Sequence, residues 1–329
     1  MTRELTRLVE CVPNVSEGRR PEVVDEIVSA FAVPGVLVLD RSSDPDHHRT
    51  VITLMGPGPA LVEGAVAGAR ACARLIDLNH HRGVHPRMGA LDVLPFIPFG
   101  AETRLRGGDD PDLDCADLAE RAGRRIAAEV GVPVYLYGAV ARHPGWRALP
   151  EVRGRGFETL RAALAARHAN PNPPGPPDPP GPDFGGPGLH PTAGATAAGA
   201  REVLIAYNVE LADADLALAR RVASAVRERD GGLPAVRAMG VPLVHRGVVQ
   251  VSMNLLDWRA TPPAAAYAAV AALAEEHGAR VEASEIVGLA PAGALDGVDP
   301  ADLRLRGFSP DMLLESRLLQ ALTTSEETR

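Results

Sequence analysis

The sequence contains no lysine, so arginine supplies all 34 of its basic residues. The formal net charge is −8, which argues against a nucleic-acid partner, because proteins that bind nucleic acids normally present a basic face. Arginine suits bidentate contacts with carboxylates, so a local cationic pocket stays compatible with the acidic total. Aromatic residues are scarce at 4%, but the apolar fraction of 46% is that of an ordinary globular protein.

Cysteines and long apolar runs are scarce as well. Cys11, Cys72 and Cys115 are odd in number, lie far apart and form no CxxC pair, so we expect neither a disulfide framework nor a thiolate metal site. No apolar run approaches the roughly 18 residues of a membrane span, and the N-terminus, MTRELTRLVEC, has no apolar signal core. We therefore expect a soluble, cytoplasmic protein without a membrane partner.

Hydrophobic patterning predicts alternating strands and helices in two halves. A chain of 329 residues is long for one core, which favours two domains. The first half has the order β-α-β-β-α-β-α-β. Its strands are expected at 8–15, 35–40, 49–55, 91–97 and 132–137. Its helices are expected from residue 21 and at 60–76 and 113–130, and a polar loop is expected at 41–48. The second half has the order β-α-β-β-α-β, with strands at 203–209, 236–243, 248–254 and 281–287 and helices at 213–229 and 263–278.

The repeated order predicts an α/β (α+β) protein with two ferredoxin-like βαββαβ subdomains and a ligand cleft between them. We expect the subdomains to cover residues 1–202 and 203–329. Residues 170–182 contain eight prolines in thirteen positions, which predicts an extended, solvent-exposed spacer within the first subdomain.

The most unusual stretch is DLNHHRGVHPRMGALDVLPFIP, residues 77–98, where three of the ten histidines fall within six positions. His85 follows Gly83 and precedes Pro86, which disfavours a helical conformation at His85. An imidazole with a pKa near neutral can act first as general base and then as general acid. Two other interpretations remain: a surface histidine without a task, and a metal site shared with His81, although a helix presenting both rings is improbable here.

Two further groups of polar residues are candidates for ligand contacts. The segment DPDHHR, residues 44–49, is either a solvated acidic turn or a place where Arg49 anchors a substrate carboxylate, and its carboxylates and imidazoles could also hold a metal. Asn14, Asn208 and Asn254, the last with Asp257 close behind, lie at the ends of predicted strands, where they are either turn residues or the lining of a cleft.

The segment 185–194 is rich in glycine but lacks the Lys-Ser/Thr of a P-loop and the GxGxxG order. It is either a flexible connector or a loop whose backbone approaches a planar ligand.

Six stretches of the chain resemble the formiminotransferase family, in order and over nearly its whole length. They are LVECVPNVSEG (8–18), LIDLNHHRGVHPRMGALDVLPFIP (75–98), VPVYLYG (132–138), the segment 183–201 with GATAAGAR, VSMNLLD (251–257) and SEIVGL (284–289). The resemblance implies transfer of the formimidoyl group of N-formimidoyl-L-glutamate to N5 of tetrahydrofolate, a step of histidine degradation and one-carbon metabolism. It also implies tetrahydrofolate as co-substrate, no metal, and a homodimer.

The resemblance also assigns roles to residues. The family's catalytic histidine maps to His85, with His80 and His81 as support. The folate loop maps to Gly185, Gly186, Pro187, Gly188, Leu189, His190, Pro191, Thr192, Ala193 and Gly194. Further contacts with substrate or folate are expected at Asn14, Arg49, Arg87, Tyr137, Asn208, Asn254 and Asp257.

The chain departs from the family pattern at several points. The proline-rich segment is unusual, His48 stands where Asn is expected before the arginine, and LHPTAG replaces a more aromatic version of the folate loop. We expect cyclodeaminase activity to come from a separate protein. Three alternative activities remain: formyl transfer between glutamate and tetrahydrofolate, metal-dependent hydrolysis of formimidoylglutamate, and folate binding without transfer.

Overall fold

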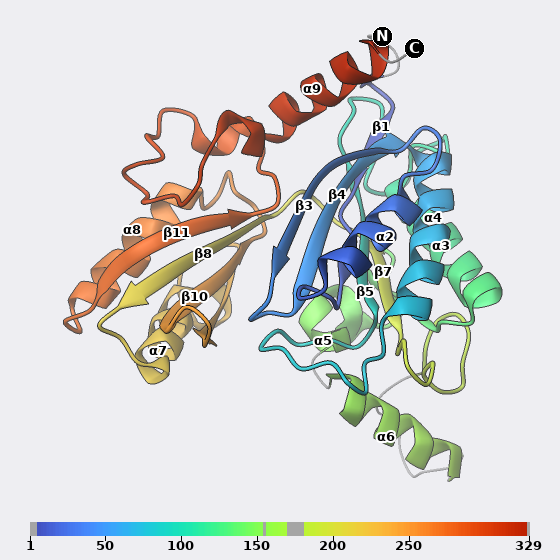
Figure 1. Ribbon diagram of the computed structural model, residues 1–329, viewed down its shortest axis with the longest axis horizontal. Coiled ribbons are helices and arrows are strands. Elements are labelled where there is room, and N and C mark those ends of the chain that lie inside the picture. Colours follow the sequence, from blue (N-terminus) through green and yellow to red (C-terminus); the bar gives the residue numbers. More distant parts are fainter. Residues whose placement is uncertain (1–4, 154–155, 170–180, 328–329) are drawn as a thin grey trace. The chain divides into compact units, whose positions relative to one another are not determined.

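The computed structural model describes residues 5–153, 156–169 and 181–327, and the chain forms two compact units, residues 1–201 and 202–329 (Figure 1). Most of the proline-rich segment predicted at 170–182 lies outside the described residues.

The first unit is built on one mixed sheet. Its strands, from one edge to the other, are β3 (Leu37–Asp44), β4 (Arg49–Pro57), the pair β1 (Leu8–Cys11) and β2 (Asn14–Val15), then β5 (Leu91–Pro98), β7 (Thr196–Ala200) and β6 (Val134–Gly138). Both β1 and β2 pair with β4 on one side and β5 on the other, so they continue one line of the sheet. The pairs of β7 with β5 and β6 are parallel, and the other pairs are antiparallel.

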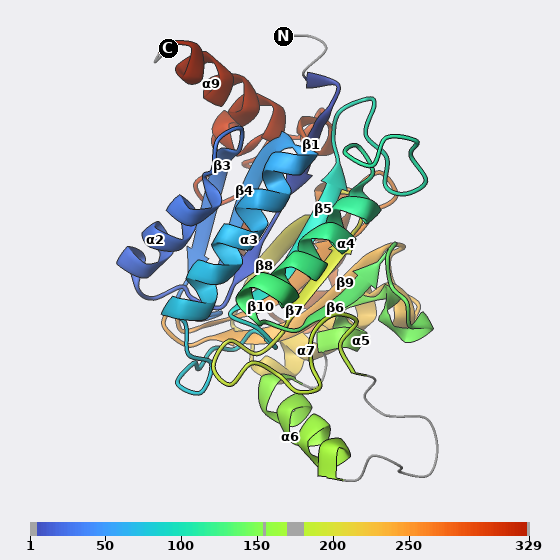
Figure 2. The same cartoon turned by 90° about the vertical axis from the view of Figure 1, so that its right-hand side faces the viewer.

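Three helices cover one face of this sheet: α2 (Pro21–Phe31), α3 (Gly58–Leu75) and α4 (Cys115–Arg125), which continues as a π-helical turn over Ile126–Val130 (Figure 2). Their apolar sides and the facing strand residues form the main core. The helices pack closely because of small residues: a Cβ on Gly68 of α3 would meet the Phe31 ring of α2 at 2.3 Å. Asp114 caps α4 by accepting hydrogen bonds from the amides of Ala116 and Asp117.

A second, smaller core lies on the opposite face of the same sheet. It is formed by strands β5 to β7 and by the 3-10 helix Pro144–Arg147, α5 (Leu149–Arg153) and α6 (Gly156–Ala169). Tyr135 and Tyr137 of β6 pack there with Trp146, Val152 and the apolar residues of α6. This core brings α5 and α6 to the edge of the sheet where the histidine-rich segment begins.

The second unit contains a four-stranded antiparallel sheet in the order β11 (Arg280–Val287), β8 (Ile205–Ala212), β10 (Val248–Leu255), β9 (Val236–Leu243). Helices α7 (Leu216–Val226) and α8 (Pro263–Glu275) provide apolar residues to its core, and α9 (Leu314–Glu327) follows. Three 3-10 helices complete the unit, at Glu228–Asp230, Ala292–Leu295 and Pro310–Met312. When β1 and β2 are counted as one strand, β1 to β5 of the first unit have the same strand order, so the repeated βαββαβ topology expected from the sequence is present.

The structure corrects two expectations and adds four elements. The loop expected at 41–48 is in part a strand, because β3 continues to Asp44, which pairs with Arg49 of β4. The single strand expected at 8–15 is interrupted at Pro13, which has no amide hydrogen for a sheet ladder. Strand β7 and helices α5, α6 and α9 were not predicted.

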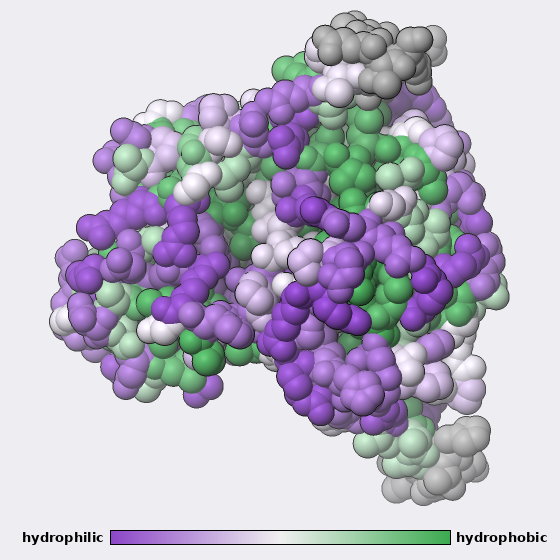
Figure 3. Space-filling model, viewed as in Figure 1, coloured by the Kyte–Doolittle hydropathy of each residue, from purple (hydrophilic) through white to green (hydrophobic). Residues whose placement is uncertain are grey.

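Polar residues predominate on the visible surfaces of both units (Figure 3). Large apolar residues that are exposed are few in the described ranges, namely Met239, Val244 and Leu319. In the same ranges, no helix combines the length and apolar character that crossing a membrane requires.

Candidate functional site

Two loops that are distant in sequence lie side by side in the first unit: the histidine loop, residues 77–90, and the glycine loop, residues 185–194. The amide of Leu78 donates to the carbonyl oxygen of Thr192 at 2.9 Å, and the amide of Ala90 donates to that of Ala193 at 2.8 Å. The side chain of Asn79 donates from Nδ2 to the carbonyl oxygen of Pro191 at 3.2 Å. The proposed catalytic histidine and the proposed folate loop therefore belong to one structural feature.

Glycine is required where the two loops cross. Gly194 has a φ of +69°, and a Cβ there would meet the carbonyl oxygen of Met88 at 2.1 Å. A Cβ on Gly89 would meet the carbonyl oxygen of Ala195 at 2.0 Å. Any side chain at Gly89 or Gly194 would therefore push the loops apart.

The glycine loop is held at both ends. At its end, His190 accepts hydrogen bonds at Nδ1 from the amides of Thr192 (3.3 Å) and Ala193 (3.0 Å), which forms a compact turn. Just before its start, the Phe184 ring lies 4.7 Å from the guanidinium carbon of Arg124 and 4.8 Å from that of Arg142. Between these anchors, Gly188 has open space around its Cα.

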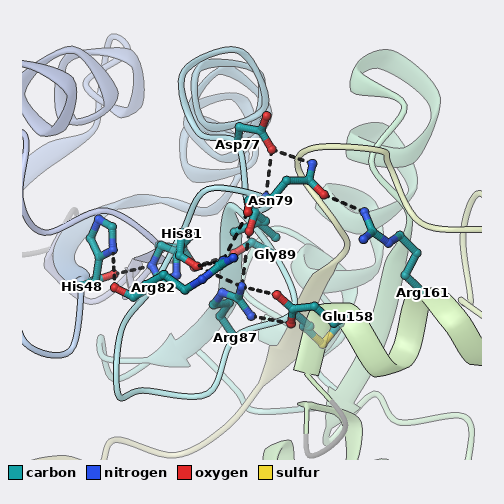
Figure 4. Close-up of polar contacts among 12 residues, drawn as sticks. His48, Asp77, Asn79, His81, Arg82, Arg87, Gly89, Glu158 and Arg161 are labelled. Carbon is teal, nitrogen blue, oxygen red and sulfur yellow. Dashed lines mark hydrogen bonds and ion pairs between the residues drawn. The ribbon is translucent and has the colours of Figure 1, made fainter.

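The turn between β3 and β4 packs against the histidine loop on its other side. The rings of His48 and His81 stack with centroids 4.0 Å apart and planes 7° apart, and His81 Nε2 lies 2.9 Å from the carbonyl oxygen of His48 (Figure 4). A Cβ on Gly83 would meet the carbonyl oxygen of His47 at 2.5 Å, so only glycine allows this approach. His48 itself has a φ of +52°, a strained conformation for histidine.

Glu17 holds the β3–β4 turn through its contact with His48, and the sequence did not identify it as a site residue. His48 Nδ1 lies 3.0 Å from the carbonyl oxygen of Arg82 and its Nε2 lies 3.2 Å from Glu17 Oε1, so both contacts are hydrogen bonds only when both ring nitrogens carry hydrogen. Burial alone would raise the pKa of Glu17, but hydrogen bonds from His48, the Arg19 amide and Arg20 outweigh it and hold that pKa far below its usual range.

One ring nitrogen of His85 is hydrogen-bonded, and the other has no hydrogen-bond partner in the described parts of the chain. Nδ1 lies 2.8 Å from the carbonyl oxygen of Pro86, which can only accept, so Nδ1 carries the hydrogen and Nε2 is the basic atom of the neutral ring. Burial of the ring, reinforced by the positive charges of Arg49 and Arg153, lowers the pKa of His85 well below 6.5. The ring of His47 lies 5.9 Å away. A histidine in this environment is neutral at pH 7, the form a general base requires.

A fully buried carboxylate, Asp92 of β5, ties the histidine loop to two arginines. Its Oδ1 accepts hydrogen bonds from the amides of Met88 (2.8 Å) and Gly89 (3.2 Å), and its Oδ2 lies 2.7 Å from Arg49 Nη1 and 3.1 Å from Arg153 Nη1. Burial alone would raise the pKa of Asp92, but the two arginines and the Met88 amide hold it below its usual value.

Arg49 is held by Asn14 as well as by Asp92, because its Nε donates to Asn14 Oδ1 at 3.0 Å. Burial lowers the pKa of Arg49 to about 10, against the attraction of Asp92, so the guanidinium stays charged at pH 7. The structure thus brings together two residues, Asn14 and Arg49, that were separate candidates in the sequence, and the charge of Arg49 acts on His85.

Arg87 has a carboxylate partner within the chain. Its two terminal nitrogens lie 2.9 Å and 2.7 Å from the oxygens of Glu158 on α6, and one of them also contacts the carbonyl oxygens of Leu78 and His81 (Figure 4). A substrate carboxylate at Arg87 would therefore have to replace or share Glu158. The role expected of Arg87 in substrate binding stays a prediction.

The remaining candidates fall into two groups. Tyr137 lies on β6 of the first unit, where burial raises the pKa of its hydroxyl. Asn208, Asn254 and Asp257 belong to the second unit. There Asn208 donates to Glu285 at 3.0 Å, Asn254 is exposed opposite Ala206, and Asp257 accepts the Arg259 amide at 3.0 Å in a turn.

Four residues of the site were missed from the sequence: Glu17, Asp92, Arg153 and Glu158. Asp92 did carry a signal, because a charged residue inside the apolar strand LDVLPFIP needs a buried partner. Arg153 and Glu158 carried none, since their contacts depend on the placement of α5 and α6. Across residues 5–153, 156–169 and 181–327, no group of three or more His, Cys, Asp and Glu is arranged to hold a metal ion.

Comparison with known proteins gives consistent matches over both units. The formiminotransferase domain, N-terminal subdomain, matches residues 8–201, and the formiminotransferase domain matches residues 206–302. The glutamate formimidoyltransferase of Thermoplasma acidophilum is 40% identical over 315 residues, 95% of this chain and 98% of that protein. That of Streptococcus pyogenes serotype M1 is 35% identical over 317 residues, 96% of this chain and 100% of that protein. The formimidoyltransferase-cyclodeaminase of Sus scrofa is 40% identical over 297 residues, 88% of this chain but 51% of that protein.

Proposed function

Because the chain belongs to the formiminotransferase family, we propose that it is a glutamate formimidoyltransferase that moves the formimidoyl group of N-formimidoyl-L-glutamate to N5 of tetrahydrofolate. The observation that supports this activity best is the environment of His85. Its ring is neutral at pH 7, its Nε2 is available, and it lies on the loop that contacts the glycine loop and beside two arginines.

In the proposed reaction, N5 of tetrahydrofolate attacks the amidine carbon and forms a tetrahedral intermediate. His85 Nε2 takes the proton that leaves N5 and passes it to the glutamate nitrogen, whose bond to carbon then breaks. Proton transfer of this kind contributes about 10²–10⁴-fold to the rate. The low pKa of His85 keeps the ring neutral at pH 7, the form that can accept the proton, and makes its conjugate acid a ready proton donor to the glutamate nitrogen.

Alignment of the two substrates supplies the rest of the rate enhancement, of the order of 7–11 kcal/mol for well-oriented reactants. We propose that the glycine loop contacts the pterin, since its backbone is open at Gly188. Asn208, Asn254 and Asp257 are further proposed contacts with substrate or folate. Arg49 and Arg87 are the proposed contacts for substrate carboxylates, and Tyr137 is a further proposed contact.

The decisive experiment measures consumption of N-formimidoyl-L-glutamate by the full chain with and without tetrahydrofolate. We expect consumption to require tetrahydrofolate and to release one glutamate for each folate modified. Consumption without tetrahydrofolate, abolished by a chelator, would instead identify a metal-dependent hydrolase. Tight folate binding with no glutamate released would identify a binding protein, and a preference for N-formylglutamate would identify a formyl transferase.

The general-base assignment is tested by His85→Ala. We expect kcat to fall by at least about 100-fold while tetrahydrofolate binding stays measurable. Arg121→Gln is the control, because Arg121 pairs with Asp112 in an exposed ion pair and its loss should leave kcat unchanged. Near-normal turnover of His85→Ala would remove His85 from the chemical step.

Four broader statements also remain predictions. We propose that the chain acts in histidine degradation and one-carbon metabolism, in the cytoplasm. We further propose that it works as a homodimer and that a separate cyclodeaminase converts its product. Sedimentation analysis tests the homodimer, and co-purification with a cyclodeaminase tests the association with that enzyme.

A further inference from the structure

The cluster around Asp92 has more positive than negative charge. Asp92 contributes one carboxylate, while Arg49 and Arg153 contribute two guanidiniums, and the side chains of the two arginines are only 9% and 12% exposed. Charge that is shielded from water and left without a counterion is costly. The cluster therefore suits the binding of one further negative charge.

The two guanidiniums also have unused hydrogen-bond donors. Each guanidinium has five N–H groups. Arg49 uses Nε on Asn14 and Nη1 on Asp92, and Arg153 uses Nη1 on Asp92. Within the described residues, the other N–H groups of these two side chains have no protein acceptor.

The packing of α5 against the smaller core of the first unit fixes the position of Arg153. It is the last residue of α5, whose Leu149 and Val152 pack into the smaller core against Trp146. Its Nη1 lies 3.1 Å from Asp92 Oδ2, the same oxygen that Arg49 contacts. Asp92 thus holds the two guanidiniums on one oxygen, beside the loop that carries His85.

We propose that Arg153 is a substrate-binding residue, which together with Arg49 binds one carboxylate of the anionic formimidoyl donor beside His85. A carboxylate has two oxygens that can accept N–H groups from two guanidiniums, and such charge-assisted bonds are strong. The identity of the anion rests on the proposed function, whereas the existence of a carboxylate site rests on the charge and the free donors.

The same arrangement couples donor binding to the basicity of His85. Burial is the largest cause of the lowered pKa of His85, and the groups that face it, Arg49 of β4, Arg153 of α5 and His47 of the β3–β4 turn, lower that pKa further. A carboxylate bound between the two arginines would offset their charge and raise that pKa toward neutral. His85 would then become a stronger base once the donor is in place.

The kinetic test compares Arg153→Gln and Arg153→Lys with the wild-type chain, and uses Arg121→Gln as the control, since Arg121 pairs with Asp112 in an exposed ion pair. We expect Arg153→Gln to raise KM for N-formimidoyl-L-glutamate by about 10–100-fold and to leave KM for tetrahydrofolate unchanged. It should also move the acid limb of kcat/KM to higher pH, since one cation near His85 is lost. An unchanged donor KM with an unchanged pH profile would overturn the proposal.

A binding test without turnover separates this inference from the proposed function. L-Glutamate should raise the Tm of the wild-type chain and of Arg121→Gln more than sodium chloride of equal ionic strength, and should fail to do so for Arg153→Gln. If Arg153→Gln does not fold, Arg153→Lys decides: we expect a several-fold loss of glutamate affinity, because an ammonium cannot offer parallel N–H groups. Wild-type affinity in the variants would refute the site, whereas Arg153-dependent binding without formimidoyl transfer would refute only the proposed function.

Discussion

We expect His81 to make the first unit sensitive to mild acid. His81 is 4% exposed, Nε2 lies 2.9 Å from the carbonyl oxygen of His48, and Nδ1 is buried with no hydrogen-bond partner among the residues that the structure describes. Burial is the largest cause that lowers the pKa of His81 to about 4, and the charges of His48 and Arg87 add to it. Protonation would therefore place a cation where it has little solvation.

The sign and size of the effect follow from proton linkage. The folded state binds a proton at His81 less readily than the unfolded state, where the pKa is about 6.5. The contribution of His81 to the free energy of unfolding is therefore fully present above pH 6.5 and is lost as the pH falls toward 4. Between pH 7 and pH 5, the loss attributable to His81 comes to about 2 kcal/mol in the free energy of unfolding.

The assay is urea denaturation at pH 7 and pH 5, followed by tryptophan fluorescence. The chain has two tryptophans, Trp146 in the first unit and Trp258 in the second, so Trp258→Phe provides a background that reports on the first unit alone. His81→Gln is the informative variant, because the glutamine amide can still donate to the His48 carbonyl but does not titrate.

We expect the reference chain to lose about 2 kcal/mol more than His81→Gln between pH 7 and pH 5. His80→Gln is the control: its ring is 87% exposed and stands in water in both states, so its loss should match the reference. Equal losses in the reference chain and in His81→Gln would refute the argument that burial governs this histidine.

Other substitutions test the charges and the close approaches around the site, in the same denaturation assay at pH 7. Asp92→Asn should cost about 3–5 kcal/mol, because it leaves two buried guanidiniums without their carboxylate, whereas Asp112→Asn in an exposed pair should cost at most about 1 kcal/mol. Gly194→Ala should cost at least about 2 kcal/mol from its left-handed backbone and its contact with the other loop, while Gly188→Ala, in open space, should stay within about 0.5 kcal/mol. Glu17→Gln should cost about 1–3 kcal/mol relative to the unsubstituted chain, since buried charge-assisted hydrogen bonds weaken. These assignments would be contradicted if Asp92→Asn were as stable as Asp112→Asn, Gly194→Ala as stable as Gly188→Ala, or Glu17→Gln as stable as the unsubstituted chain.

The elements with clear hydrophobic periodicity were predictable from the sequence. The βαββαβ order recurs in both units, and helices such as α3 and α8 begin within a few residues of the expected positions. Periodicity works here because one face of each helix or strand enters a core. The same spacing occurs in α6, where Phe157, Leu160 and Leu164 are buried on one helix face, so this helix also has a periodic pattern in the sequence.

Strand β7 could not be predicted, because Thr196 is the one β-branched residue in its sequence, TAAGA, and the other four residues are alanine and glycine. It lies between β5 and β6 in the parallel part of the sheet, and a Cβ on Gly199 would meet the Tyr137 ring at 2.6 Å. Small residues are needed there because neighbouring strands supply the bulk. That requirement belongs to the tertiary structure and leaves no local pattern in the sequence.

At Arg49 and Arg153, the use of arginine instead of lysine has a physical consequence. A buried guanidinium keeps its proton, and even the lowered pKa of Arg49 stays at about 10, whereas a buried ammonium is easily neutralised. The positive charge beside His85 therefore persists at pH 7 inside a chain of net charge −8. Composition could not identify these two arginines, because many others, such as Arg125 with Glu129, form exposed ion pairs. What distinguishes Arg49 and Arg153 is that they share a fully buried carboxylate while their own side chains are only 9% and 12% exposed, and only the fold shows that.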